Sequence, residues 1–377
     1  MSLPRPRADS EAPVPGTPGE AAPGPAYRWL VPVWTLVGLF AVVTVAWSRH
    51  VGIPVKDPDG AILRSRVAIS LGLFVVLALI DAGVRTGRRG WSVRNAAAQL
   101  GSRWTRRRLV LAMSGLLAYH LVYFCYHNLK SWDVFNQVRD PLLLRWDRWL
   151  FLGHSPAVLL HDLFGQHVAA YVLMVVYESF SSIVSVSFVA ALVFADRIRD
   201  GYVFIASALW VWILGVGSYY LIPSLGPFHS APEEFAGLPH TMIQDTQARY
   251  MAQRAHLLAH PHASDAFAQV SAFASLHVAV TSLILLMAHY YRLRVVTRTM
   301  AVFLVGTMLA TVYLGWHFAV DDLAGLAIAC VSVLLGRLMI YPRGRPLSWG
   351  APLTFRAAPD YCDADNASVS NATSASS

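Results

Sequence analysis

Long apolar runs recur along this chain, and polar, arginine-rich or proline-rich segments separate them. A helix needs about 20 mostly apolar residues to cross the hydrocarbon core of a bilayer. Most of the runs reach or approach that length, which indicates transmembrane helices. We therefore predict an all-α fold, a polytopic membrane helical bundle with about eight transmembrane helices, at residues 29–47, 67–84, 109–127, 168–194, 203–222, 273–291, 300–315 and 318–341.

The segments outside these runs suggest a division of the chain into four parts. Residues 1–26 are rich in Pro, Gly, Ala and Glu, so we expect a disordered N-terminal tail. Residues 27–108 hold two additional transmembrane helices and a basic loop. Residues 109–341 form a six-helix core, and residues 342–377 form a flexible tail. The first apolar run does not resemble a cleavable signal, because a long stretch precedes it and no small-residue cleavage site follows.

Composition and charge point to a membrane protein with a defined orientation. Hydrophobic residues make up 55% of the chain and charged residues 14%, and the mean hydropathy is +0.46, which excludes an ordinary soluble enzyme. The net charge of +8 comes mostly from loop arginines, so it does not indicate a nucleic-acid partner. Residues 85–108 contain eight arginines and no acid, which predicts a cytoplasmic loop. Counting spans from this loop places both termini in the cytoplasm, in a multi-pass protein of the cell membrane.

Two local patterns predict structure outside the spans. In the loop after the third span, Trp146 and Trp149 alternate with charged residues over 140–151, as in a helix lying at the level of the lipid headgroups. Near the inner end of the second span, Asp81 precedes Arg85 by four residues, a spacing that favours an ion pair on one helical face.

The candidate chemistry lies at the starts of the sixth and eighth spans. His317 stands four residues before Asp321 in the stretch LGWHFAVDDLAG, and His277 ends the stretch ASLH. The span count places both histidines on the outer side. Two imidazoles and a carboxylate suit attack on phosphorus, with one ring as nucleophile, the acid fixing its tautomer and the other ring as proton donor. If this stretch is helical, His317 and Asp321 share a face, although a structural ion pair closing a helix end would give the same spacing.

These two stretches resemble the last two signatures of the type 2 phosphatidic acid phosphatase superfamily. Together with YLIPSLGP at 220–227, they are similar to the branch that holds inositol phosphorylceramide synthase, over roughly residues 120–341. The resemblance implies that His317 attacks phosphorus and forms a phosphohistidine, that Asp321 orients His317, and that His277 protonates the leaving oxygen and then activates water or an alcohol. It implies no metal and no cofactor.

The function expected from this resemblance is that of an integral membrane lipid phosphatase or phosphotransferase. Its partners are then a phosphorylated lipid, water or an alcohol acceptor, and the bilayer, with the active site facing outside. Departures from the family pattern leave the phosphate-holding groups open: the first signature, a Lys followed at a distance by Arg-Pro, is not recognisable, and residues 311–316 lack the expected Arg. The candidates for contacts with phosphate or substrate are Ser275, Arg139, Arg145, Arg249, Arg254 and the intramembrane Glu178.

Two other classes of function deserve weight. A haem-binding membrane redox protein could use His120 together with His277 or His289 as axial ligands. A transporter would show broken helices and internal symmetry, but the sequence has no visible repeat and its polar cluster lies at the membrane rim. His256 and His260 are four residues apart, but no neighbouring cysteine or acid completes a metal site in the sequence.

Overall fold

The computed structural model describes residues 27–87 and 91–342, and every regular element in them is helical. The predicted tail at 1–26 and nearly all of the predicted tail at 342–377 lie outside the described residues. Seven helices are long and apolar enough to cross a membrane. The all-α, polytopic prediction is therefore confirmed. The seven are α1 (Leu30–Val51), α2 (Arg64–Gly87), α4 (Arg106–Trp132), α7 (Val168–Phe194), α8 (Ile198–Leu221), α12 (Arg294–Tyr313) and α13 (Ala319–Ile340).

The sixth predicted span is shorter than expected. Helix α11 (Leu276–Tyr290) has 15 residues, or about 22 Å at 1.5 Å per residue, against a hydrocarbon core of about 30 Å. The apolar residues before it, from about 264, run as irregular backbone instead of helix. Helix α11 still runs within the bundle, packed against α12 and α13.

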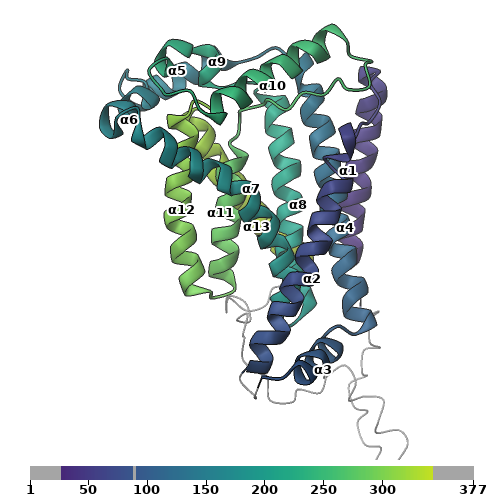
Figure 1. Ribbon diagram of the computed structural model, residues 1–377. Coiled ribbons are helices and arrows are strands. Elements are labelled where there is room, and N and C mark those ends of the chain that lie inside the picture. Colours follow the sequence, from purple (N-terminus) through teal and green to yellow (C-terminus); the bar gives the residue numbers. More distant parts are fainter. Residues whose placement is uncertain (1–26, 88–90, 343–377) are drawn as a thin grey trace, which may run out of the picture.

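Helix α8 is the central helix of the bundle, and most of its residues are buried. Helices α13 and α4 pack against it along much of their length, while α1 lies outside α4. Helix α7 crosses the bundle obliquely between α2 and α12 (Figure 1). The apolar faces of these helices meet in one continuous core.

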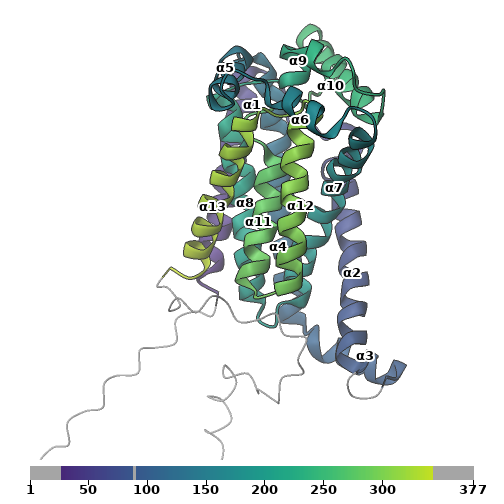
Figure 2. The ribbon, with the colours of Figure 1, turned by 90° about the vertical axis from the view of Figure 1, so that its left-hand side faces the viewer.

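Short helices gather at the two ends of the bundle. Figure 2 shows α5, α6, α9 and α10 at one end, where α11 and α13 begin, and α3 at the other. The tryptophan-rich helix predicted after the third span is α5: Trp149 is 81% exposed, while Asp140 and Asp147 on the same helix are buried. The bounds of the short helices are α3 (Val93–Arg103), α5 (Asp140–Leu150), α6 (Pro156–Phe164), α9 (Pro227–Ser230) and α10 (Met242–Ala259).

An ionic cluster joins the elements at the α3 end. The predicted pair of Asp81 with Arg85 is confirmed at 2.8 Å, and Arg103 of α3 reaches the other oxygen of Asp81 at 2.6 Å. Arg85 also contacts Asp196, in the turn between α7 and α8, at 3.0 Å. These arginines therefore stabilise the fold at this end as well as setting the charge of the loop.

Candidate active site

The two histidines predicted to act together do lie together. His277 is the second residue of α11 and His317 directly precedes α13, and both helices begin at the end of the bundle covered by the short helices. Their ring centroids are 5.9 Å apart. Residues 40 positions apart in the sequence thus form a neighbouring pair of rings, tilted by 59°.

The link between His317 and Asp321 differs in detail from the predicted shared helical face. Helix α13 begins at Ala319, so His317 lies outside it and Asp321 is its third residue. The Asp321 carboxylate folds back to the helix start, where Oδ2 accepts the Phe318 N–H at 3.0 Å, as an N-terminal cap does. The same oxygen lies 3.4 Å from Nδ1 of His317. The contact between ring and acid therefore comes from helix capping and not from helical periodicity.

A close approach of α11 and α13 joins the two histidine motifs. A Cβ on Gly325 would lie 2.5 Å from the carbonyl oxygen of Ser275, so only glycine lets the helices come this near. The Ser275 N–H donates to the Asp321 carbonyl oxygen at 3.0 Å. The Ser275 side chain is fully buried and caps α11 by accepting the Val278 N–H at 3.4 Å. Its hydroxyl is thus already engaged in the fold.

A second carboxylate, Asp322, also belongs to this junction. The Thr311 hydroxyl of α12 donates to its two oxygens at 3.1 and 3.3 Å. Thr311 also accepts the backbone N–H groups of Trp316 and His317 on its carbonyl oxygen, at 3.0 and 3.1 Å. Asp322 therefore fixes the turn that carries His317, a role that the sequence did not reveal.

A comparison with protein families identifies this arrangement. The model of the PAP2 superfamily matches residues 141–335, which run from α5 to within α13 and contain both histidine motifs. The chain belongs to the PAP2 superfamily. No curated protein and no solved structure matches the chain. Membership of the PAP2 superfamily indicates an enzyme of the phosphatase type embedded in a membrane.

The residues matched by the PAP2 model begin with α5, and that helix holds the turn of His317 in place. Oδ2 and Oδ1 of Asp147 accept the N–H groups of Ala319 and Val320, at 2.8 and 2.9 Å. These amides belong to the first turn of α13, where the helix itself offers them no acceptor and a nearby negative charge is favourable. Burial raises the pKa of the Asp147 carboxyl to about 6, although the two backbone hydrogen bonds and the loss of water act in opposite directions.

Asp140, seven residues before Asp147 on α5, holds the loop after α8 in the same way. Its Oδ1 accepts the N–H groups of Leu225 and Gly226, at 2.9 and 3.1 Å. Gly226 has φ +111°, and a Cβ there would lie 2.6 Å from the Trp316 carbonyl oxygen. Two buried acids of one interfacial helix thus fix the loop of the YLIPSLGP stretch and the turn before α13.

Aromatic rings enclose the His277 side of the PAP2 site. Tyr177 of α7 stacks on the His277 ring with centroids 4.3 Å apart. Phe180, also on α7, has its ring centroid 4.3 Å from that of His277. Tyr177 also stacks on Trp316, at 5.6 Å. These rings limit the access of water to the gap between the two imidazoles.

The electrostatic surroundings keep His317 neutral. Burial lowers the pKa of His317 to about 3, and the positive charge of Lys130 adds to this effect. A neutral imidazole is the nucleophilic form. The positive charge of Lys130, near the end of α4, also acts on His277 and is thus felt at both rings. Sequence reasoning missed Lys130, because it lies 147 positions before His277 in the chain and no local spacing links the two residues.

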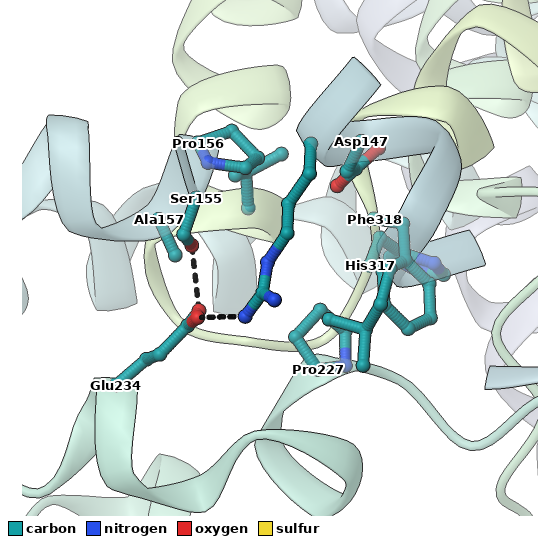
Figure 3. A pocket seen from close by; sticks show the side chains of 11 residues that line it. Asp147, Ser155, Pro156, Ala157, Pro227, Glu234, His317 and Phe318 are labelled. Atoms are coloured by element: carbon teal, nitrogen blue, oxygen red, sulfur yellow. Dashed lines mark hydrogen bonds and ion pairs between the residues drawn. The ribbon is translucent and has the colours of Figure 1, made fainter. Parts of the chain in front are cut away.

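A small pocket adjoins His317. Figure 3 shows Asp147, His317 and Phe318 on one side of this pocket and Ser155 and Glu234 on the other. Arg148 lines it too and lies 3.6 Å from Glu234, which also accepts the Ser155 hydroxyl at 2.6 Å. Arg148 of α5 thus lies beside the turn that carries His317.

The remaining sequence candidates lie farther out. Arg139, Arg145 and Arg249 are exposed, and Glu178 is exposed on α7. Arg254 of α10 is partly buried, and its Nε has no hydrogen-bond partner within the described residues. The structure does not gather these side chains around the two histidines as it does Lys130.

The histidines considered as metal or haem ligands have other partners. Nδ1 of His120 lies 2.7 Å from the Leu116 carbonyl oxygen and Nε2 lies 3.1 Å from the Ser70 hydroxyl, so both ring nitrogens are engaged. His256 contacts Asp265 at 3.2 Å. Within residues 27–87 and 91–342, no three His, Cys, Asp or Glu side chains gather in a metal-binding group.

Proposed function

We propose that this PAP2 protein is a lipid phosphatase or phosphotransferase that works through a phosphohistidine at the outer face of the membrane. The observation that carries the proposal is the pair of imidazoles 5.9 Å apart, one of them 3.4 Å from a buried carboxylate. His317 as the nucleophile, Asp321 as its orienting acid and His277 as the proton donor are then close enough to act on one phosphoryl group.

In the first step, Nε2 of His317 attacks the phosphorus atom, since Nδ1 faces Asp321. The N–P bond forms while the bond between phosphorus and the lipid oxygen breaks. His277, in its protonated form, gives its proton to the departing oxygen. Asp321 stabilises the positive charge that develops on His317. Lys130, whose charge acts on His317, and Arg148, which lines the pocket beside His317, are better placed to hold the phosphoryl oxygens than Arg139, Arg145 and Arg249.

In the second step, neutral His277 takes the proton from water or from an alcohol. The oxygen of that molecule attacks the phosphohistidine, the N–P bond breaks, and neutral His317 is restored. Likeness to the inositol phosphorylceramide synthase branch favours transfer to a lipid or polyol hydroxyl. The rings of Tyr177, Phe180 and Trp316 around His277 support transfer, because a site that excludes water protects the phosphohistidine from hydrolysis.

Trapping the covalent intermediate tests the proposal directly. The purified protein is quenched during turnover of phospholipids labelled with ³²P in the headgroup, and the label is tested for the acid lability of phosphohistidine. The wild type should carry label, and His317→Ala should carry none. His277→Ala should lose about 10²–10⁴-fold in turnover, the usual contribution of a general acid–base group. Undiminished turnover by His317→Ala contradicts the assignment of the nucleophile.

A panel of acceptors separates hydrolysis from transfer. Each labelled lipid is incubated with and without inositol and other alcohols, and the products are resolved by chromatography. A transferase should yield a new phosphodiester that depends on the alcohol. Release of free phosphate at an unchanged rate under all conditions would instead identify a phosphatase.

A further inference from the structure

A second cavity lies outside the catalytic gap, among α2, α4, α7 and α8. It has a volume of about 490 Å³ and lies at the level of the membrane-spanning helices. Ile69 of α2 and Val186 of α7 line it and are 57% and 41% exposed, so the cavity reaches the surface that faces lipid. A lipid headgroup could therefore enter it sideways from the bilayer.

Polar side chains line this cavity on two sides. Polar side chains inside membrane spans are costly and tend to serve function. Hydroxyl groups come from both flanking helices, and a cationic group comes from α2. They are Ser65, Arg66 and Ser70 of α2 and Ser181, Ser182 and Ser185 of α7.

Arg66 gives the cavity a positive charge without a counter-ion. No Asp or Glu is among the residues that line it. In the described part of the chain, no carboxylate lies within ion-pair distance of Arg66. The guanidinium instead lies over the Tyr123 ring, 4.8 Å from its centroid. An arginine held on an aromatic face retains its fork of N–H groups for an anion such as phosphate.

The cavity also borders the catalytic site. Phe180 lines the cavity and packs against His277 with ring centroids 4.3 Å apart. In the proposed mechanism, the leaving oxygen and the accepting hydroxyl both bind on the His277 side. A headgroup held in the cavity would thus lie one aromatic ring away from the proton donor.

We propose that this cavity binds an anionic phospholipid, with Arg66 contacting its phosphate and the serines contacting neighbouring oxygens. The catalytic consequence, delivery of that lipid to His277, rests on the proposed function; the binding site itself does not. Arg66 belongs to α2, outside the residues matched by the PAP2 model, so the site is built by a helix added to the family domain.

Lipid binding can be measured without turnover in the full-length His317→Ala protein. Native mass spectrometry in detergent compares the occupancy of phosphatidylglycerol with that of phosphatidylethanolamine of the same chains. Adding Arg66→Ala should weaken phosphatidylglycerol binding about tenfold or more, the loss expected for a hydrogen-bonded charge pair. Arg64→Ala is the matched control, because Arg64 lies two residues away on α2, is exposed and does not line the cavity.

Each outcome is decisive. Equal lipid preference in Arg66→Ala and Arg64→Ala overturns the site. Arg66→Lys keeps the charge but loses the fork of N–H groups, so its preference should lie between those of the wild type and Arg66→Ala. If Arg66→Ala loses phosphatidylethanolamine binding as much as phosphatidylglycerol binding, packing on Tyr123 explains the effect and the anion site is wrong. Turnover of the wild type is measured separately. A protein that selects phosphatidylglycerol through Arg66 but transfers no phosphate contradicts the proposed function and leaves the binding site standing.

Discussion

At the residue scale, the site depends on carboxylates that hold backbone amides. Asp321 caps Phe318, and Asp147 binds the amides of Ala319 and Val320, so two acids converge on the turn that carries His317. Each supplies acceptors for N–H groups that a helix start leaves unpaired. The position of the nucleophile therefore depends on the ionisation of groups that do not react.

The pKa of Asp147 leads to a prediction for stability against pH. Its folded-state value of about 6 lies above the ordinary value of 3.8, so between these values the folded protein holds a proton that the unfolded chain has released. The free energy of unfolding that this group contributes therefore falls as pH rises through that window, by about 1.4 kcal/mol per unit of pKa difference. Asp147→Asn has no carboxyl at this position, so this contribution to the pH dependence of its stability is absent.

Thermal unfolding in detergent between pH 4 and 7 tests the prediction. The Tm of Asp147→Asn relative to the wild type should rise from pH 4 to about pH 6 and then level off. Asp162→Asn, which removes an exposed acid of α6, should follow the wild-type profile at every pH. A constant difference between Asp147→Asn and the wild type across this range contradicts the raised pKa.

The residues that the sequence revealed are those linked by local spacing. His317 and Asp321 are four apart, and capping makes such neighbours meet even though His317 is outside the helix. Asp147 and Lys130 act on the same turn from 170 or more positions away in the chain, a relation that only the packing of α5 and α4 creates. Ser275 shows the reverse case, because a hydroxyl that looked available for phosphate is used as a helix cap.

At the element scale, the packing of α11 on α13 sets the gap between the two imidazoles. The absence of a side chain at Gly325 allows this approach, since a Cβ would meet the Ser275 carbonyl oxygen at 2.5 Å and the Ala279 nitrogen at 3.2 Å. Both are backbone atoms at the start of α11, so they cannot move without moving His277. Gly325 thus connects helix packing to the distance between the two imidazoles.

Gly325→Ala should push the two helices apart and impair the enzyme. Overpacking of a close contact costs about 1–3 kcal/mol, so we expect a lower Tm and a loss of phosphohistidine formation larger than the loss of folded protein. Gly38→Ala on α1 is the control, because nothing lies within 4 Å of its added Cβ. Wild-type labelling by Gly325→Ala would show that the gap tolerates a wider helix spacing.

Apolar runs predicted the long helices well because the length and hydropathy of a run are enough to indicate a membrane-spanning helix. The prediction for α7 has the same bounds as the helix, and those for α4 and α2 fall inside theirs. Helix α11 was overestimated because hydropathy does not distinguish a buried irregular segment, such as the residues before Leu276, from a continuing helix. The short helices α6, α9 and α10 have 9, 4 and 18 residues and contain no apolar run of membrane-spanning length. Hydropathy therefore did not reveal them.

At the scale of the whole molecule, charge is distributed unequally between the two ends of the bundle. The end with α3 carries Arg85, Arg94 and Arg103, together with the arginines around the α7–α8 and α11–α12 turns. The end with α5, α6, α9 and α10 carries the candidate active site. We propose that residues 109–341 form the catalytic core, and that α1 and α2 add a wall with its own lipid site.

This asymmetry predicts the orientation of the active site. Arginine-rich loops are retained in the cytoplasm, so the α3 end should lie inside and the two histidines should open to the exterior. Single cysteines introduced at Ser102, exposed on α3, and at His154, exposed beside α5, report the two ends. They are placed in a background without Cys125, Cys330 and Cys362.

In intact cells, a membrane-impermeant maleimide should label His154→Cys and spare Ser102→Cys until the cells are permeabilised. The opposite labelling would place the candidate site in the cytoplasm, and the lipid phosphate would then have to come from the inner leaflet. Because α5 supplies Asp140 and Asp147 to the loops of the candidate site, the accessibility of residue 154 reports on which side of the membrane that site lies. The side that is labelled therefore decides from which leaflet a lipid phosphate can reach the two histidines.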